Sequence, residues 1–427
     1  MSELLARHRH VMPSWLSLYY EEPIEVVRGS GRHVWDADGN RYLDFFGGIS
    51  TTLTGHAVAE VVEAIREQAG RVIHTSTLYM VRPMIELAER IAALAPMPEA
   101  KVFFVNSGTE ANDTALLLAT AYTGSNQVLA LRNGYHGRSV STQAVTGNRF
   151  WSASPWTPFA VTYVPNGDSL RGPQQGLAGD KLIEACTAEL RYAIDTQTSG
   201  RLACLIVEPI QGVGGLVTPP DGLFAAYQEV TADFGALLVS DEVQTGWGRT
   251  GEHFWGIEAH AVDPDVVTFA KGIGNGLGIG GVIARPDVMD SIESHSISTF
   301  GGNPLVTAGA LANVEHLLSN DLQANAAARG AELFDVLGPL ADRLPAVLDV
   351  RGKGLMVGIE LVEPGTDVPD PARAAAVHER ARAGGLLVGK GGLYDNVVRM
   401  VPPLTVTAAE VAEACAVLVA ALEAVGG

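Results

Sequence analysis

The stretch that decides the expected fold is residues 236–272, ALLVSDEVQTGWGRTGEHFWGIEAHAVDPDVVTFAKG. It contains two apolar runs, Ala236–Ser240 and Asp265–Ala270, and an ionisable residue follows each run at once. Such runs between polar turns and glycine are typical of strands buried in a parallel sheet, although short buried helices have similar patterns. Open α/β sheets bind ligands beyond the carboxyl ends of their strands. We therefore expect Asp241 and Lys271 to lie where a ligand binds.

An acid and an amine at that edge suit an aldehyde cofactor with a basic ring nitrogen. The amine of Lys271 can form an imine with the aldehyde, and the carboxylate of Asp241 can keep the ring nitrogen protonated. The sequence therefore predicts pyridoxal phosphate, with the ring between the two side chains and no direct ion pair. The alternative is a structural ion pair between Asp241 and Lys271.

Composition and charge exclude several classes of protein. The chain has 427 residues, 47% of them hydrophobic, which suggests two or three globular domains. A formal charge of −19 argues against binding to nucleic acid or to an anionic membrane, and no apolar run is long enough to span a bilayer. The three cysteines are far apart, so neither disulfides nor a metal site is expected. We expect a cytoplasmic enzyme.

The pattern along the chain predicts an α/β fold with a mostly parallel central sheet flanked by helices, and a smaller α+β domain. We expect residues 1–60 to hold a hairpin around Asp38-Gly39-Asn40 that packs with the small domain. Strands and helices alternate over residues 61–305, the large cofactor-binding domain. Residues 306–427 are expected to form the small domain. Ser152–Gln175 has no clear period and is expected to be an irregular excursion.

Polar clusters follow other predicted strands. Ser107, Gly108 and Thr109 stand between a strand and a helix, where free amides and the helix dipole favour a phosphate; a plain helix cap is the alternative. Tyr135 could stack on a flat cofactor or simply pack, and Arg138 could bind a carboxylate or lie on the surface. The glycines of residues 276–281 fit GxGxxG, but a strand-like segment follows them, so a nicotinamide site is rejected.

Taken in order, these clusters resemble the class III pyridoxal-phosphate aminotransferases of fold type I. The resemblance runs from about Pro23 to Thr407 and is most specific in Leu238–Gly251, with Phe269-Ala270-Lys271-Gly272 in the family's register. The motifs that stand in the same order elsewhere are Asn106–Asn112, Tyr135–Arg138, Glu208–Gly212, Thr299–Pro304 and Arg351–Gly354. Within this family, the motifs resemble those of the alanine–glyoxylate type 2 and β-aminoisobutyrate branch most.

The resemblance implies a role for each site residue. Lys271 is expected to bind the cofactor and shuttle a proton, and Asp241 to pair with the ring nitrogen. Val243 and Tyr135 are expected on the two ring faces, and Gln244 at the ring oxygen. The remaining residues expected at the cofactor are Ser107, Gly108, Thr109, Glu208 and, from a neighbouring subunit, Thr299. This last role implies a homodimer with shared active sites.

The same resemblance points to the substrates. Arg399 matches the family arginine that binds a substrate carboxylate, and Val213 stands where many relatives have a glutamate that masks it. The arginine at position 138 departs from that branch and resembles the one in the 4-aminobutyrate and acetylornithine enzymes, where it contacts a carboxylate. Arg138 and Arg399 together could therefore hold a dicarboxylate. We expect a transaminase that moves an amino group from alanine or a β- or ω-amino acid to pyruvate, glyoxylate or 2-oxoglutarate. The alternatives are an aminomutase or racemase on the same fold, or a binding protein without turnover.

Overall fold

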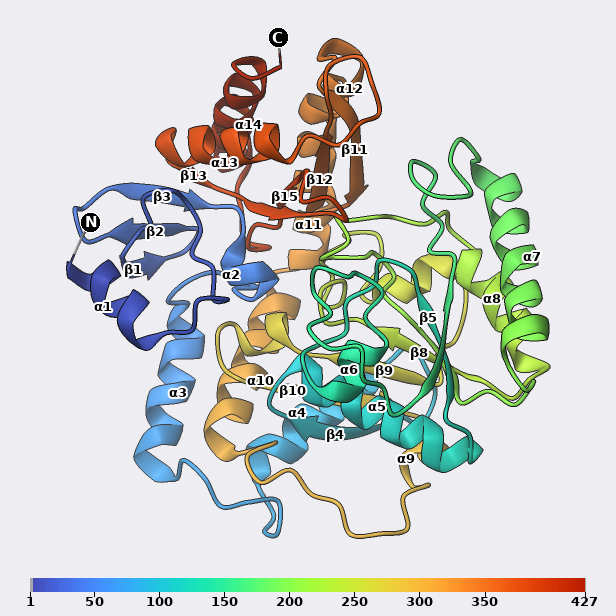
Figure 1. Cartoon of the computed structure of the whole chain (residues 1–427). Coiled ribbons are helices and arrows are strands. Elements are labelled where there is room, and N and C mark those ends of the chain that lie inside the picture. Colours follow the sequence, from blue (N-terminus) through green and yellow to red (C-terminus); the bar gives the residue numbers. More distant parts are fainter. Residues whose placement is uncertain (1–2, 427) are drawn as a thin grey trace.

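A seven-stranded sheet forms the centre of the molecule in the computed structural model, which describes residues 3–426 (Figure 1). Its spatial order is β4-β10-β9-β8-β7-β5-β6, and every neighbouring pair is parallel except the two that involve β10. The strands are β4 (Lys101–Val105), β5 (Gln127–Leu131), β6 (Ala160–Val164), β7 (Cys204–Val207), β8 (Leu237–Asp241), β9 (Val266–Phe269) and β10 (Gly280–Ala284). The expected fold class is confirmed.

The central strands are apolar throughout because both of their faces are buried. In β7, Cys204 and Ile206 pack in one core cluster, whereas Leu205 and Val207 pack in the other. The first cluster includes the apolar face of α5 (Gly108–Thr123). The second includes side chains of α7 (Gly179–Gln197) and α8 (Leu223–Ala232) on the opposite side. A strand covered on both faces reads as a continuous apolar run, which is the pattern that the sequence shows.

The N-terminal hairpin shares a sheet with the C-terminal part of the chain. Strands β1 (Val26–Ser30), β2 (His33–Asp36) and β3 (Arg41–Asp44) are antiparallel, and β13 (Leu386–Leu387) adds to β3 in parallel. The carboxylate of Asp36 closes the turn by accepting hydrogen bonds from the backbone N–H groups of Asp38 (3.1 Å) and Asn40 (2.8 Å). The hairpin was expected at this turn, while the division of the chain at residues 60 and 305 stays a prediction.

A third, antiparallel sheet carries the C-terminal site residue. Its order is β11 (Val347–Lys353), β12 (Met356–Leu361), β15 (Val397–Met400) and β14 (Gly389–Gly391). Helices α13 (Pro371–Ala383) and α14 (Ala408–Glu423) lie over this part of the chain (Figure 1). Two further helices, α10 (Pro304–Ser319) and α11 (Leu322–Leu337), connect it to the large sheet, and α10 packs on α3 (Ala59–Arg71) and α4 (Arg82–Ala93).

The expectation of an irregular excursion over Ser152–Gln175 was wrong in part. Residues 160–164 form β6, which pairs in parallel with β5 at the edge of the large sheet. An edge strand has only one neighbour, and Thr162 and Tyr163 give it a mixed composition, so the apolar signal of the central strands is absent. A helix at Glu3–Val11 was not expected either; it has no buried residue.

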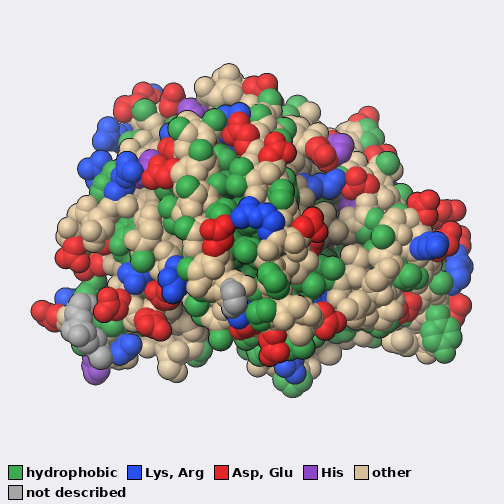
Figure 2. All heavy atoms as spheres, turned by 90° about the horizontal axis from the view of Figure 1, so that it is seen from above, with side chains coloured by type: hydrophobic (Ala, Val, Ile, Leu, Met, Phe, Trp, Pro, Cys, Tyr) green, Lys and Arg blue, Asp and Glu red, His purple; other side chains and the backbone are tan. Residues whose placement is uncertain are grey.

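The surface carries charges of both signs on the face that Figure 2 shows. On the face seen in Figure 2, acidic and basic side chains are interspersed with apolar ones. Among residues 3–426, no helix combines the length and the apolar character needed to cross a bilayer.

Candidate active site

A cavity of about 260 Å³ lies at the carboxyl ends of the parallel strands, and the N-terminal region and the C-terminal sheet contribute to its lining. Strands β5, β7, β8 and β9 all end at this edge, as does the strand that precedes α5. Ten of the twelve site residues expected from the sequence line this one cavity: Ser107, Gly108, Thr109, Tyr135, Glu208, Asp241, Val243, Gln244, Lys271 and Arg399.

One end of the cavity is the N-terminus of α5, a helix of 16 residues. The hydroxyl of Ser107 caps the helix by accepting a hydrogen bond from the backbone N–H of Glu110 at 3.2 Å. A Cβ atom built on Gly108 would lie 3.1 Å from both γ-carbons of Val243, so a side chain there would be crowded. Exposed first-turn amides, the helix dipole and the Thr109 hydroxyl together suit a phosphate group.

At the floor of the cavity, three donors fix the carboxylate of Asp241. Its Oδ2 accepts a hydrogen bond from Asn112 Nδ2 at 2.7 Å and lies 2.8 Å from His136 Nδ1, while Oδ1 accepts from the backbone N–H of Val243 at 3.1 Å. Burial alone would lower the pKa of His136, but the hydrogen bond and charge of Asp241 raise it above its ordinary value. The carboxylate is therefore an oriented anion, suited to holding a protonated ring nitrogen.

Lys271 lies at the end of β9 in an unusual backbone conformation. Its φ is +48°, and the amide of Asn313 holds the turn after it by donating to the carbonyls of Gly272 (3.0 Å) and Ile273 (2.9 Å). Burial lowers the pKa of the Lys271 amine to about 8, against the opposing effect of Asp241. The ion pairs of Asp241 among residues 3–426 include His136 but not Lys271, so the structural ion pair considered above is not formed.

Tyr135 and Val243 come from different loops and both face the cavity. The carboxylate of Glu208 ties the loop of Tyr135 to the next one, because it accepts hydrogen bonds from the backbone N–H groups of Tyr135 (2.8 Å) and Gly212 (3.0 Å). Burial raises the pKa of Glu208 to about 7. The ring of Tyr135 also meets the ring of Trp151 edge-on, with 5.5 Å between the centroids. Tyr135 and Trp151 together form an aromatic side of the cavity.

Arg399, on β15, is a buried cation without an acidic partner. Its side chain is 3% exposed, no ion pair among residues 3–426 includes it, and its Nε has no hydrogen-bond partner there. Burial lowers the pKa of the guanidinium. Nη2 donates to Oε1 of Gln244 at 2.8 Å, which leaves the N–H groups of Gln244 for an acceptor in the cavity. A buried, unpaired guanidinium is a strong candidate for binding a carboxylate.

Two of the expected site residues are not brought into the cavity. Arg138 is exposed, and its guanidinium lies 5.2 Å from the centroid of the Trp15 ring. Thr299 is exposed in the connection between α9 (Pro286–Met289) and α10. Within one chain, therefore, Arg399 is the arginine that faces the cavity.

Sequence reasoning missed other residues of the site. Asn112 and His136, which hold Asp241, belong to motifs that were recognised, but neither was assigned a role. Tyr19, Phe46, Ile49, Trp151 and Lys390 also line the cavity. They come from segments far apart in the sequence, and none of them was assigned a role from the sequence. Among residues 3–426, no cluster of three or more potential metal ligands occurs.

The residues present fit pyridoxal phosphate by their chemistry. An amine with a lowered pKa, a fixed carboxylate and a helix N-terminus without a crowding side chain face one cavity. Asp241 is buried, and Tyr135 and Val243 line the same cavity, whose volume is about 260 Å³. When bound, the cofactor supplies an electron-withdrawing ring that accepts the electron pair of a broken C–H bond.

Comparisons with known proteins agree with this site. Residues 19–422 match the family described as Aminotransferase class-III. The chain is 39% identical over 407 residues to alanine–glyoxylate aminotransferase 2 homolog 2, mitochondrial, of Arabidopsis thaliana, covering 95% of this chain and 83% of that protein. It is 41% identical over 400 residues to the acetylornithine aminotransferase of Mycolicibacterium smegmatis, covering 92% of each.

A solved structure supports both the fold and the cofactor. An amine transaminase from an uncultivated Pseudomonas species, crystallised in its PLP-bound form, superimposes with a TM-score of 0.89 at 32% identity, covering 98% of each chain. These relatives transfer amino groups by name, which favours transamination over the isomerase and binding-protein alternatives. The chain therefore belongs to the class III aminotransferases and is a pyridoxal-phosphate-dependent transaminase.

Proposed function

We propose that both substrates of this transaminase bind Arg399 through a carboxylate, and that the acceptor is a monocarboxylic 2-oxo acid such as pyruvate or glyoxylate. The single observation that carries the proposal is the buried guanidinium of Arg399, which lacks an acidic partner within residues 3–426. Val213 lines the same cavity and has no charge with which to mask it. The donor is accordingly alanine or a β- or ω-amino acid.

Among residues 3–426 of one chain, Arg399 is the one arginine that lines the cavity, and this favours a monocarboxylate. A dicarboxylate such as 2-oxoglutarate needs a second buried cation, and Arg138 is exposed against Trp15. Lys390 lines the cavity, but its Nζ lies 3.7 Å from Asp395, which offsets part of its charge. A small acceptor with a single carboxylate would neutralise the unpaired guanidinium of Arg399.

In this proposal, each protein group has a separate role in the reaction. The neutral amine of Lys271 would take the proton from the amino-bearing carbon of the donor and pass it to the C4′ carbon of the bound cofactor. In the second half-reaction it would carry a proton back from C4′ to the carbon of the acceptor that receives the amino group. Asp241 keeps the proton on the ring nitrogen, and Gln244 donates to the ring oxygen while Arg399 holds its amide in place. The amides at the start of α5 hold the phosphate. These groups come from several parts of the fold, so the fold fixes their relative positions around the cavity.

Replacing Arg399 tests the proposal. We expect Arg399→Lys to raise the KM of pyruvate or glyoxylate about 100-fold, because a lysine cannot form the paired hydrogen bonds of a guanidinium. KM for an amine donor without a carboxylate, such as 1-phenylethylamine, should change less than about threefold. Steady-state kinetics over a matrix of donors and acceptors gives both values.

Arg138→Ala is the matched control, since it removes an arginine that lies outside the cavity. It should change the KM of each acceptor less than about twofold. The proposal fails if 2-oxoglutarate is the best acceptor and Arg138→Ala selectively abolishes its use.

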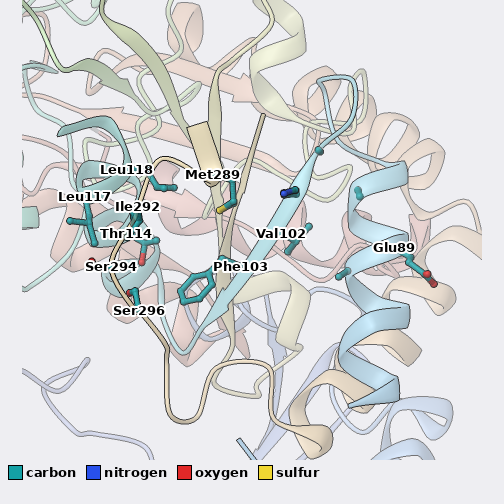
Figure 3. A pocket seen from close by; sticks show the side chains of 14 residues that line it. Glu89, Val102, Phe103, Thr114, Leu117, Leu118, Met289, Ile292, Ser294 and Ser296 are labelled. Carbon is teal, nitrogen blue, oxygen red and sulfur yellow. The ribbon is translucent and has the colours of Figure 1, made fainter. Parts of the chain in front are cut away.

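We further propose a homodimer in which Thr299 of one subunit completes the cofactor site of the other. Exposed apolar side chains support this, notably Leu78 (73% exposed), Met80 (94%) and Phe300 (61%). A groove of about 500 Å³ also lies beside the edge strand β4 (Figure 3). Val102 faces α4 and Phe103 faces the α5 side of this groove. A patch of this kind is typical of a protein interface, here one with a second copy.

Co-expression of two inactive variants tests the shared site. Lys271→Ala and Thr299→Ala homodimers should both be impaired, whereas a mixed dimer contains one cavity with both native residues. Random pairing should therefore restore about a quarter of wild-type activity. A fully active Thr299→Ala protein, or a monomer by sedimentation velocity, would refute the proposal. Location in the cytoplasm stays a proposal from the sequence, to be checked by fractionation.

A further inference from the structure

Lys271 begins a short 3₁₀ turn, Lys271–Gly274, whose backbone is left-handed at its first residue and just beyond its last. The φ angle is +48° at Lys271 and +44° at Asn275. A residue with a Cβ atom adopts this conformation at a cost, because the Cβ atom crowds its own backbone. Such strain persists only where neighbouring contacts over-determine it. The contacts that hold this turn therefore decide where the amine of Lys271 points.

The amide of Asn313, in the middle of α10, makes two of these contacts. Its Nδ2 donates to the carbonyls of Gly272, at 3.0 Å, and Ile273, at 2.9 Å, the two residues that follow Lys271. The Asn313 side chain is 0% exposed, so its bonds do not compete with water. Two hydrogen bonds from one rigid amide fix the position of the turn relative to the helix.

The oxygen of the same amide is held by Thr54. The Thr54 hydroxyl donates to Oδ1 of Asn313 at 2.6 Å, and Thr54 is 1% exposed. Its backbone is fixed as well, because its N–H donates to Oδ1 of Asn275 at 3.1 Å and its carbonyl accepts from Thr405 Oγ1 at 3.0 Å. The carbonyls of the turn can only accept, so the amide nitrogen must face them and the oxygen must face Thr54.

Burial alone does not explain an asparagine at position 313. The neighbouring buried positions of α10 are taken by Ala310, Val314 and Leu317. A buried amide is costly unless its polar atoms are paired, and an apolar residue would pack there without that cost. What the asparagine adds is its hydrogen bonds to the turn that carries Lys271.

We propose that Asn313, oriented by Thr54, is a positioning residue that aims the amine of Lys271 into the active-site cavity by holding the backbone of its turn. Lys271 lines the cavity, whereas neither Asn313 nor Thr54 does. Asn313 therefore acts on the bond between Lys271 and the cofactor, and not on the phosphate site at the start of α5.

Two measurements with pyridoxal phosphate separate positioning from general stability. In covalent capture, the amine of Lys271 forms an imine with the aldehyde and water leaves; stopped-flow absorbance of the apoprotein gives its rate. Equilibrium dialysis in the Lys271→Ala background gives the noncovalent dissociation constant. We expect Asn313→Leu to slow capture about 100-fold, because a displaced amine reacts poorly. In the Lys271→Ala background it should change the dissociation constant less than about twofold.

Variants of Thr54 test the same contact more gently, should Asn313→Leu fold poorly. Thr54→Val removes the hydroxyl but keeps the branched shape, so the amide of Asn313 loses the bond that orients it. We expect capture to slow about tenfold. Thr54→Ser keeps the hydroxyl and should capture the cofactor within about twofold of the wild-type rate.

Asn396→Leu is the matched control. Asn396 is 1% exposed, and its Nδ2 donates to the carbonyl of Leu361 at 2.8 Å and to Oε1 of Glu360 at 3.3 Å, away from the lining of the cavity. Both leucine variants should lower the melting temperature by about 3 °C, but only Asn313→Leu should slow capture. A wild-type capture rate in Asn313→Leu or Thr54→Val overturns the proposal. So does equal slowing in Asn396→Leu, or noncovalent binding that weakens as much as capture slows.

Discussion

Lys271→Ala is expected to lower kcat at least about 10⁴-fold, the largest effect of any substitution considered. The variant loses both the nucleophile that anchors the cofactor and the base that moves the proton, and no other lysine of residues 3–426 but Lys390 lines the cavity. Steady-state turnover with the best donor and acceptor measures the loss. The phosphate cradle at α5 is untouched, so equilibrium dialysis should still detect noncovalent cofactor binding.

Lys271→Arg separates charge from proton transfer. Arginine keeps a positive charge but cannot become neutral near pH 8, so it should be as inactive as alanine. Lys181→Ala, on the exposed first turn of α7, is the matched control and should retain full activity. Turnover by Lys271→Arg above about 1% of wild type would contradict the role assigned to the amine.

The same amine predicts how cofactor capture depends on pH. Because burial lowers the pKa of Lys271 to about 8, the neutral, nucleophilic fraction rises with pH and levels off above that value. The rate at which the apoprotein takes up pyridoxal phosphate should therefore increase about tenfold per pH unit below pH 7 and become flat above pH 9. Stopped-flow absorbance measures this rate. A rate that is still rising steeply at pH 10 would mean that the amine titrates like one in water.

Asp241→Asn should lower kcat about 10³-fold with little change in the size of the side chain. The amide has no charge to keep the ring nitrogen protonated, and removal of one preorganised electrostatic contact typically costs 10²- to 10³-fold or somewhat more. The replacement also disturbs the contacts with Asn112 and His136, because an amide nitrogen placed at Oδ2 would meet two donors. Turnover and cofactor absorbance, measured together, distinguish a slower reaction from a loss of bound cofactor.

Two controls make this result interpretable. Asn112→Ala removes one donor but keeps the charge, so its loss of kcat should be smaller, about tenfold. The melting temperature of both apoproteins shows whether the floor of the cavity still folds. If Asp241→Asn keeps more than about a tenth of the wild-type kcat with full cofactor occupancy, a carboxylate at the ring nitrogen is not required.

The sequence was informative wherever a residue sits at a fixed place on a regular element. Asp241 and Lys271 were predicted to lie at one ligand site because each follows a buried strand, and β8 and β9 are parallel neighbours. Ser107–Thr109 followed from a strand-to-helix junction in the same way. Such residues reach the edge of the sheet by geometry that is local to each strand, so spacing along the chain suffices.

Other parts of the site depend on contacts between distant segments. Tyr19 and Ile49 reach the cavity only because the N-terminal region packs on the C-terminal sheet, and nothing in their own neighbourhood indicates this. Arg138 stands in a recognisable motif, yet its side chain turns outward to Trp15. The edge strand β6 was missed because half of the usual burial signal is absent at an edge. These features depend on tertiary packing, so the local sequence pattern does not predict them.

The pairing of β3 with β13 has a consequence for synthesis of the protein. The carbonyl of Leu387 accepts a hydrogen bond from the backbone N–H of Phe45 at 2.9 Å, and the backbone N–H of Val401 donates to Phe45 at 2.7 Å. These anchors join residues more than 300 positions apart, so they cannot form until nearly the whole chain has left the ribosome. The large sheet can close earlier, during elongation. The side of the cavity that carries Phe46 and Ile49 is therefore completed last, and a nascent chain stalled before residue 386 holds its catalytic lysine in an unfinished site.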